Sequence, residues 1–422
     1  MPEWSYQSDR IFCRVLSSAV LVLFVFFLKV MVNVTYLDAS IRRFFPAVEN
    51  MLYLDSAHQT PLAEPVKAEL DRFYDASLQF AGPKCNWLNR IEEVRAQLAG
   101  FFGARPEEIA FTKNTSEGLN ICANGVAWEP GDNVLLLESE HPNNAYAWLA
   151  KRDQGLEVRL VPADKEWADA DTFATYIDDR TRAIAISHVM FHSGQRNDIE
   201  GIFASVQDRD ISVVVDAMQS VGVIPFNVKD IGATALASGS HKGLLTPHGL
   251  GFMYTAEPME ELKPSYVSTA GVANARADLL ATVDPIELQP NAHRFEIGNF
   301  NLPAIHALGG ALTLLEQVGV ANIEAHAYTL GDQLIEIADR LGIGLVGPRE
   351  REHRAPHIYV LDVKDPEVAS YFAEQNVRLS PVRDGLRVSF GVYSTPEDVE
   401  SFGSLLHRAL DAATLSTAST AI

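Results

Sequence analysis

The apolar residues between positions 100 and 260 fall into short runs that alternate with helical stretches. These runs are rich in Val, Ile and Leu: IAFT (109–112), NVLLLES (133–139), EVRLVPA (157–163), RAIAISHV (182–189), SVVVDA (212–217) and LGFMY (250–254). Continuous apolar runs predict strands buried on both faces, and helices between them predict a mostly parallel sheet. The pattern therefore predicts an α/β fold.

Polar–apolar periodicity predicts helices over 65–76 and 87–102, and a longer one over 302–319. HIYVLDV and LRVSF then read as strands, and TPEDVESFGSLLHRALDAA as a closing helix. We expect four segments: an N-terminal segment over 1–45, a large α/β domain over 46–295, a smaller α+β C-terminal domain over 296–415, and a tail over 416–422.

The N-terminal segment contains an uncharged apolar run from Val15 to Leu28. Alone it is shorter than the roughly 20 residues that span a bilayer, but extension to Val34 reaches that length with Lys29 inside. The run is a membrane anchor, a secretory signal, or an upstream stretch before a natural start at Met31. We expect a cytoplasmic enzyme, with membrane anchoring through residues 15–34 as the alternative.

Composition narrows the functional classes. Hydrophobic residues make up 47% and charged residues 21%, which excludes a disordered chain. Lys and Arg number 34 against 55 Asp and Glu, a net charge of −21 that opposes binding to nucleic acid through the general field. The three cysteines (Cys13, Cys85 and Cys122) show no metal-ligand spacing, so we expect no metal site.

Ligands of such a sheet lie at the carboxyl ends of its strands. Thr115 and Ser116 follow the first strand and open a helix, as either a phosphate cradle or a plain capped start. His141 follows the second strand and is either a ring-stacking group or an ordinary loop histidine.

Asp216 ends a buried strand, with Gln219 shortly after it, and requires either a cationic partner or a helix to cap. Lys242 stands before a glycine-rich segment, as either an imine-forming lysine or a surface lysine. Together these groups fit pyridoxal 5′-phosphate: the lysine forms an imine with the aldehyde, the aspartate pairs with the ring nitrogen, and the glutamine meets the phenolic oxygen.

The chain resembles the class V aminotransferase and cysteine desulfurase family, whose members have the fold-type I architecture of pyridoxal phosphate enzymes. The matching stretches are YLDSAH (53–58), FTKNTSEGLN (111–120), EHPNN (140–144), SHVMFHSGQRNDI (187–199), VDAMQSVG (215–222), SHKGLLTPHGLGFMY (240–254), RFEIGNFNLPAIHALGGAL (294–312) and LRVSFGVYSTPEDV (386–399). Among the family's branches, the pattern is most similar to the isopenicillin N epimerase-like one.

The resemblance implies a role for each candidate. Lys242 carries the cofactor, Asp216 pairs with the pyridinium nitrogen, Gln219 meets the phenolate, and His141 stacks on the ring. The groups implied to hold the phosphate are Thr115, Ser116, Ser240, His241 and Asn299. Arg387 grips the substrate carboxylate, with Arg378 and Arg383 as nearby alternatives, and His58 is a second substrate-binding residue. The family also implies a homodimer that borrows the RFEIGN stretch across the interface.

The sequence departs from the family pattern at several positions. No cysteine follows Cys122, whereas desulfurases carry a nucleophilic cysteine near the position of SPVRDG (380–385). Phe191 stands where desulfurases have an asparagine, and Asn299 replaces a threonine. Gly239 replaces the serine three residues before the lysine, which leaves open whether Ser238 or Ser240 meets the phosphate.

We therefore expect a pyridoxal phosphate enzyme that acts on an amino acid through an external aldimine and an α-carbanion, with class V transamination as the first expectation. The alternatives are a C–S or other β-eliminating lyase without a persulfide cysteine, and an amino-acid epimerase. An alternative of another class is a catalytically degenerate binding protein with the same fold.

Overall fold

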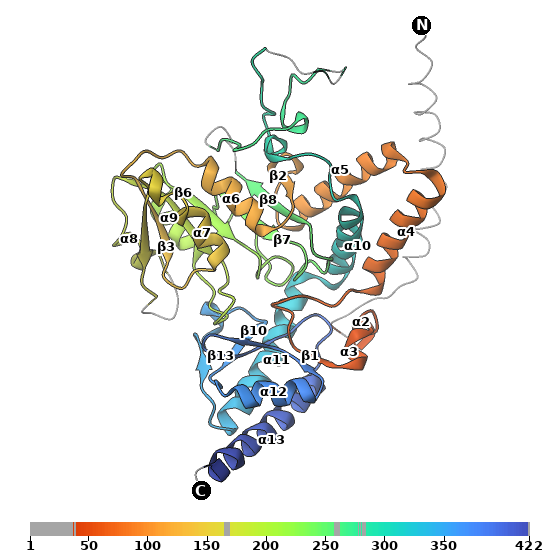
Figure 1. Ribbon diagram of the computed structural model, residues 1–422, viewed down its shortest axis with the longest axis vertical. Helices are drawn as coiled ribbons and strands as arrows, with labels where there is room; N and C mark the ends of the chain where they lie inside the picture. The colour runs from red at the N-terminus through yellow and green to blue at the C-terminus, as the bar shows by residue number, and fades with distance from the viewer. Residues whose placement is uncertain are drawn as a thin grey trace.

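The computed structural model describes residues 37, 39–163, 169–256, 262–276, 278, 280 and 284–420. Its centre is a seven-stranded sheet in the order β2-β8-β7-β6-β5-β3-β4 (Figure 1). The strands are β2 (Ile109–Thr112), β3 (Asn133–Leu137), β4 (Glu157–Val161), β5 (Thr181–Ser187), β6 (Ser212–Asp216), β7 (Ala235–Gly239) and β8 (Gly251–Thr255). The α/β fold with a mainly parallel sheet is confirmed.

One strand runs against the others. β8 is antiparallel to both β2 and β7, whereas the pairs from β7 across to β4 are parallel. β2 therefore points the same way as β7, and the carboxyl ends of all strands except β8 meet at one edge of the sheet. The loops that leave this edge carry the predicted site residues.

Strand β7 was not predicted, because its sequence ALASG lacks the bulky residues that mark a buried strand. Small side chains are needed there because helix α6 (Thr115–Gly125) lies directly on the strand. A β-carbon added to Gly118 of α6 would lie 2.8 Å from Cβ of Ala237. Strand β7 is therefore buried because α6 packs closely on it, although it has no large apolar side chains.

Helices cover the sheet and extend beyond it. The described helices are α2 (Ala39–Arg42), α3 (Ala47–Asn50), α4 (Glu64–Phe80), α5 (Lys84–Phe101), α6, α7 (Pro142–Leu149), α8 (Ala170–Ala174), α9 (Ile199–Val206), α10 (Leu302–Val318), α11 (Val320–Arg340), α12 (Pro366–Glu374) and α13 (Pro396–Thr420). Helix α10 packs on α4 and α5 beside the large sheet (Figure 1). The domain division at residue 296 stays a prediction, and this packing favours a boundary nearer residue 320.

A second group of elements lies at the other end of the molecule (Figure 1). Its four-stranded antiparallel sheet has the order β12-β13-β10-β9, formed by β9 (Leu345–Val346), β10 (Ile358–Leu361), β12 (Ser380–Val382) and β13 (Gly385–Ser389). In addition, β1 (Leu52–Tyr53) pairs in parallel with β11 (Val377–Arg378). The chain after residue 50 therefore joins this smaller part before it enters the large sheet.

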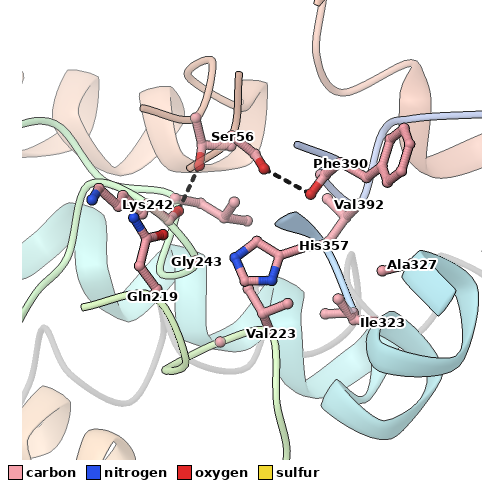
Figure 2. A pocket seen from close by; sticks show the side chains of 14 residues that line it. Ser56, Gln219, Val223, Lys242, Gly243, Ile323, Ala327, His357, Phe390 and Val392 are labelled. Atoms are coloured by element: carbon pink, nitrogen blue, oxygen red, sulfur yellow. Dashed lines mark hydrogen bonds between the residues drawn. The ribbon is translucent and has the colours of Figure 1, made fainter. Parts of the chain in front are cut away.

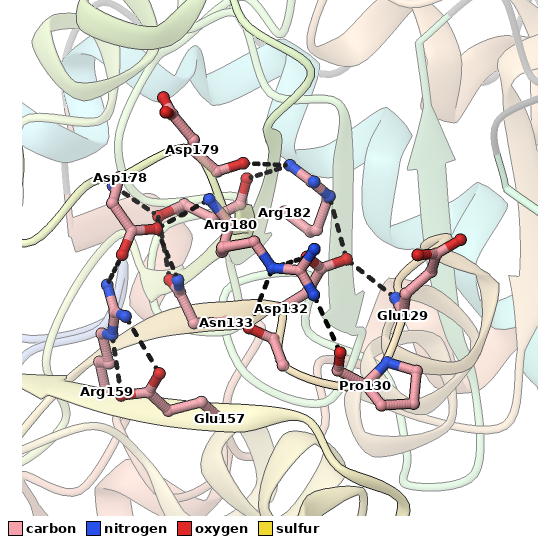
Figure 3. Close-up of polar contacts among 12 residues, drawn as sticks. Glu129, Pro130, Asp132, Asn133, Glu157, Arg159, Asp178, Asp179, Arg180 and Arg182 are labelled. Atoms are coloured by element: carbon pink, nitrogen blue, oxygen red, sulfur yellow. Dashed lines mark hydrogen bonds and ion pairs between the residues drawn. The ribbon is translucent and has the colours of Figure 1, made fainter.

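An ion-pair network fixes the strand starts at the edge opposite the predicted site (Figure 3). Asn133, the first residue of β3, donates from Nδ2 to Oδ1 of Asp178 at 2.9 Å. Arg159 of β4 pairs with the same carboxylate at 2.6 Å, and Arg182 of β5 pairs with Asp132 at 3.1 Å. Strands β3, β4 and β5 are thus cross-linked at their amino ends.

Within the described residues, no single helix is long and apolar enough to cross a membrane. Helices α10 and α11 reach the required length and composition only as a pair, bent by 71°. The apolar run over 15–34 lies outside the described residues, so anchoring through it and a cytoplasmic location both stay predictions.

Gly331 of α11 gives a test of the packing between this helix and β10. A β-carbon at residue 331 would collide with the Tyr359 hydroxyl. We expect Gly331→Ala to lower the free energy of unfolding by about 2 kcal/mol, because neither packed element has room to move.

Gly100→Ala is the matched control, since Gly100 also lies in a helix but is exposed and has open space around it. It should raise the free energy of unfolding by up to about 1 kcal/mol. Urea denaturation of both variants checks this, and an equal effect of the two substitutions would contradict the packing described.

Candidate active site

The predicted residues converge at the carboxyl edge of the large sheet. Asp216 is the last residue of β6 and is buried. Its Oδ1 accepts a hydrogen bond from the Met218 amide at 2.9 Å. Burial raises the pKa of Asp216 to about 6, against the effects of that amide and of the Lys242 charge. A protonated ring nitrogen beside this carboxylate would supply the cation that burial demands.

Gln219 follows on the same loop. Its Nε2 donates to the Ala57 carbonyl at 2.9 Å, while its buried Oε1 has no hydrogen-bond partner among the described residues. Buried polar atoms are normally satisfied, so an unpartnered one marks a position where a ligand group is expected. Figure 2 shows Gln219 next to Lys242.

Lys242 lies in the loop after β7, and Thr60 holds this loop in place. Thr60 donates from Oγ1 to the Lys242 carbonyl at 2.6 Å and from its amide to the His241 carbonyl at 3.2 Å. No hydrogen bond or ion pair to Lys242 Nζ occurs within the described part of the chain. Burial and the Arg387 charge lower the pKa of Lys242 to about 8, although Asp216 and Asp55 oppose the shift. A neutral amine suited to imine formation is therefore accessible near neutral pH.

His141 caps the start of α7, and its Nδ1 accepts a hydrogen bond from the Asn143 amide at 3.1 Å. Burial, together with the charges of Lys242 and His192, lowers the pKa of His141 to about 4. The imidazole is therefore neutral at pH 7. Its ring lies edge to face with Phe191, with centroids 4.8 Å apart. A neutral, aromatic-backed imidazole suits stacking on a flat ligand ring.

The start of α6 supplies the expected phosphate groups. Thr115 and Ser116 occupy its first turn, and the Asn114 side chain accepts from the Glu117 amide at 2.9 Å. Helix starts leave amides without intrahelical partners, which is why anions bind there. His241 stacks on His248 with ring centroids 3.9 Å apart, and burial lowers the pKa of His241 to about 3.

Two residues expected to bind the phosphate, Ser240 and Asn299, are not positioned to do so in this structure. The Ser240 hydroxyl donates to the Leu250 carbonyl at 2.8 Å and accepts from Thr246 at 2.5 Å, so it is engaged within its own loop. Asn299 is exposed on the loop after Gly298, where a β-carbon would meet open space. Phosphate binding by Ser240 and Asn299 stays a prediction, and the Ser240 bonds argue against it.

Arg387 lies on β13 and is 5% exposed. It pairs through Nη2 with Oδ1 of Asp55 at 3.2 Å and donates from Nη1 to the Phe191 carbonyl at 3.2 Å. Its Nε is buried without a hydrogen-bond partner among the described residues. A buried guanidinium with a free donor is prepared for an incoming anion, and carboxylates pair with Arg in a bidentate way.

The other residues expected to bind the substrate are more exposed than Arg387. His58 is exposed, and its amide donates to the Asp55 carbonyl at 3.0 Å. Arg378 lies 4.0 Å from Asp55 but its side chain is exposed, and Arg383 pairs with Asp384 in the turn between β12 and β13. Burial thus singles out Arg387 among the three arginines. Substrate binding by His58 stays a prediction.

Sequence reasoning did not find two buried groups. Asp55, the partner of Arg387, lies 332 residues away in the chain and has no local signal beyond its place in YLDSAH. His357 faces Ser56, Thr60, Gln219 and Lys242 across a pocket between the two parts of the molecule (Figure 2). Its Nδ1 has no hydrogen-bond partner in the described structure, and burial lowers its pKa to about 3.

Known proteins resemble this chain in sequence and in fold. The family model described as aminotransferase class-V matches residues 52–402. An uncharacterized aminotransferase of Schizosaccharomyces pombe is 36% identical over 365 residues, which cover 85% of this chain and 92% of the relative. A probable cysteine desulfurase of Methanothermobacter thermautotrophicus is 27% identical over 391 residues, covering 87% of this chain and 96% of that protein.

Among solved structures, the apo cysteine desulfurase of Thermococcus onnurineus NA1 superposes with a TM-score of 0.82 at 25% identity, covering 90% of this chain and 100% of that one. A cystine C–S lyase in complex with cysteine persulfide has the same fold, with a TM-score of 0.78 at 22% identity over 86% of this chain and 98% of its own. The narrower similarity to the isopenicillin N epimerase-like branch stays a prediction.

The lowered pKa of Lys242 gives a pH-dependent test. Imine formation requires the neutral amine, so its rate on mixing cofactor-free protein with pyridoxal phosphate should rise with pH and level off above about 8. An ordinary lysine would need a pH above about 10. Stopped-flow absorbance of the lysine-bound cofactor measures this rate.

Arg387→Met should move the midpoint of this profile to higher pH, because it removes a nearby positive charge. Arg349→Met removes a charge from an exposed pair with Asp339 and is the control that should leave the midpoint unchanged. A wild-type rate still rising steeply at pH 10 would contradict the site described.

Proposed function

Because the chain belongs to the class-V aminotransferase family, we propose that it is an enzyme that uses pyridoxal 5′-phosphate to transaminate a free α-amino acid. The main support for an amino-acid substrate is the buried Arg387. Its Nε has no hydrogen-bond partner within the described residues, and its charge lowers the pKa of Lys242. A carboxylate held by Arg387 would lie near the lysine, on which the Arg387 charge acts.

The residues present fit the cofactor. Asp216, Gln219 and the first turn of α6 offer a carboxylate, a side-chain amide and anion-binding backbone amides at one edge of the sheet. When bound, the cofactor supplies an electron sink that stabilises negative charge on the α-carbon of an amine joined to it. Asp216 favours the protonated ring nitrogen on which that electron sink depends.

Three residues of the chain have separate roles in the proposed reaction. Arg387 binds the substrate carboxylate and so fixes which α-carbon bond faces the ring. The neutral His141 covers one face of the ring and excludes water. Lys242, released as a neutral amine, accepts the α-proton and returns it to another atom. Return of the proton by Lys242 to a carbon of the cofactor would give transamination. Epimerisation would instead require a second proton donor on the face of the α-carbon opposite Lys242.

The turn at Arg383 and Asp384 bears on the alternative reactions. Strands β12 and β13 are antiparallel neighbours, and Val382 pairs with Gly385 around this short turn. The desulfurase nucleophile would be expected in this region by resemblance, but no cysteine follows Cys122. Direct persulfide transfer by a cysteine on this turn is therefore excluded from the proposal.

We further propose that the chain works as a homodimer, in which the RFEIGN stretch of one copy, buried over 294–296 and exposed over 297–299, approaches the cofactor of the other. The exposure of Asn299 and the 41% exposure of Ile297 support this arrangement. Light scattering tests the oligomeric state, and a monomer at micromolar concentration that retains full cofactor affinity would overturn it.

Arg387→Ala should weaken saturation by the amino acid at least about tenfold while the cofactor stays bound, because a charge-assisted pair is worth roughly 1.5–3 kcal/mol. The matched control is Arg383→Ala, since that arginine is exposed and paired with Asp384. The absorbance change on titration with amino acids measures apparent affinity, and equal effects of the two substitutions would remove Arg387 from this role.

The reaction itself is tested by product analysis. The purified holoenzyme is mixed with single amino acids without an acceptor, and the proposal predicts bleaching of the visible cofactor band with one equivalent of 2-oxo acid released. Multiple turnovers to pyruvate with ammonia or sulfide would instead establish a lyase, and inversion of the α-carbon would establish an epimerase. No response to any amino acid would favour a binding protein.

A further inference from the structure

Residue 239 lies at the end of β7, three positions before Lys242, and its surroundings are crowded. A β-carbon there would lie 3.0 Å from Met218 Sδ, 3.2 Å from Thr115 Oγ1 and 3.4 Å from His241 Nδ1. The backbone of Gly239 does not have a positive φ, so a side chain is opposed by space alone. Two of the three crowding groups are expected phosphate ligands.

The sulfur of Met218 links these groups. Thr115 donates from Oγ1 to Met218 Sδ at 2.9 Å, and the Gly239 amide donates to the same sulfur at 3.1 Å. These donors come from the first turn of α6 and the end of β7, which meet at the expected phosphate end. A thioether is only a weak acceptor, so a phosphate oxygen would replace it with a gain in hydrogen-bond strength.

The hydroxyls of Ser238 and Ser240 do not point into the space beside residue 239. The Ser238 hydroxyl donates to the Gly239 carbonyl at 2.9 Å, and the Ser240 hydroxyl donates to the Leu250 carbonyl. The hydroxyl absent at residue 239 is therefore not supplied by either adjacent residue. The Met218 side chain fills the space instead.

We propose that Met218 and Gly239 form a coupled pair that shapes the phosphate end of the cofactor site. Met218 fills the space beside residue 239, and its sulfur is the temporary partner of the Thr115 hydroxyl and the Gly239 amide until a phosphate oxygen takes its place. A side chain at residue 239 would press against this sulfur, and Met218 would have to shift by a few tenths of an ångström to admit it. The proposal rests on the family's cofactor and not on which reaction follows.

A double-mutant cycle tests this coupling. Dissociation constants are measured for wild type, Gly239→Ser, Met218→Ala and the double variant, with pyridoxal phosphate and with pyridoxal. The readout is the ratio of the two affinities, because pyridoxal lacks the phosphate and cancels changes in ring packing. Ser238→Ala and Ser240→Ala are the controls.

Gly239→Ser should lower the ratio at least about tenfold, Met218→Ala should change it less than about threefold, and the double variant should return to within about threefold of wild type. The two serine controls should keep the wild-type ratio. Additive effects in the double variant, an unchanged ratio in Gly239→Ser, or a loss in either control as large as that of Gly239→Ser would overturn the proposal.

Gly239→Ala, alone and with Met218→Ala, repeats the test with a smaller side chain if Gly239→Ser fails to fold. Thermal unfolding of the cofactor-free variants identifies such a failure. Because binding is measured without substrate, loss of the proposed transaminase activity would leave this result unaffected, and the two failures are distinguishable.

Discussion

The site depends on a buried ion pair between segments at opposite ends of the chain. Asp55 and Arg387 are 2% and 5% exposed, and their charged atoms lie 3.2 Å apart. Removal of one partner from such a pair leaves an uncompensated buried charge, which is strongly destabilising. Asp55 also forms a β-bridge with Ser389, so the segment 55–60 is fixed to the small sheet two residues from Arg387.

The same segment then reaches the large sheet. The Ala57 carbonyl accepts from Gln219, and Thr60 bonds to the backbone of His241 and Lys242. A stretch of six residues therefore joins the proposed carboxylate site to the proposed cofactor site. Relative movement of the two parts of the molecule would be felt at both sites through this segment.

Charge at the site is confined to a few groups. Burial lowers the pKa of His141, His241 and His357, so these imidazoles are neutral at pH 7. The positive field comes from Arg387 and Lys242 and is opposed by Asp216 and Asp55. Two cationic and two acidic groups thus balance around Lys242, so the site does not share the strong negative charge of the whole chain, which is −21.

The sequence predicted strands with continuous Val, Ile or Leu runs, because burial on both faces leaves that mark. It did not predict β7, whose small residues reflect contact with α6 rather than hydrophobicity. Strand-end residues such as Asp216 could be placed by topology. The Asp55 partner of Arg387, and the direction of the Ser238 and Ser240 hydroxyls, depend on contacts distant in the chain or on rotamers, which no local pattern encodes.

The most direct test of this account is borohydride reduction of the purified holoenzyme, followed by peptide mass spectrometry. The account predicts that reduction removes the visible absorbance band and leaves a phosphopyridoxyl group on Lys242 alone. A protein that takes up no pyridoxal phosphate, or that carries the label on another lysine, would contradict the assignment of the site.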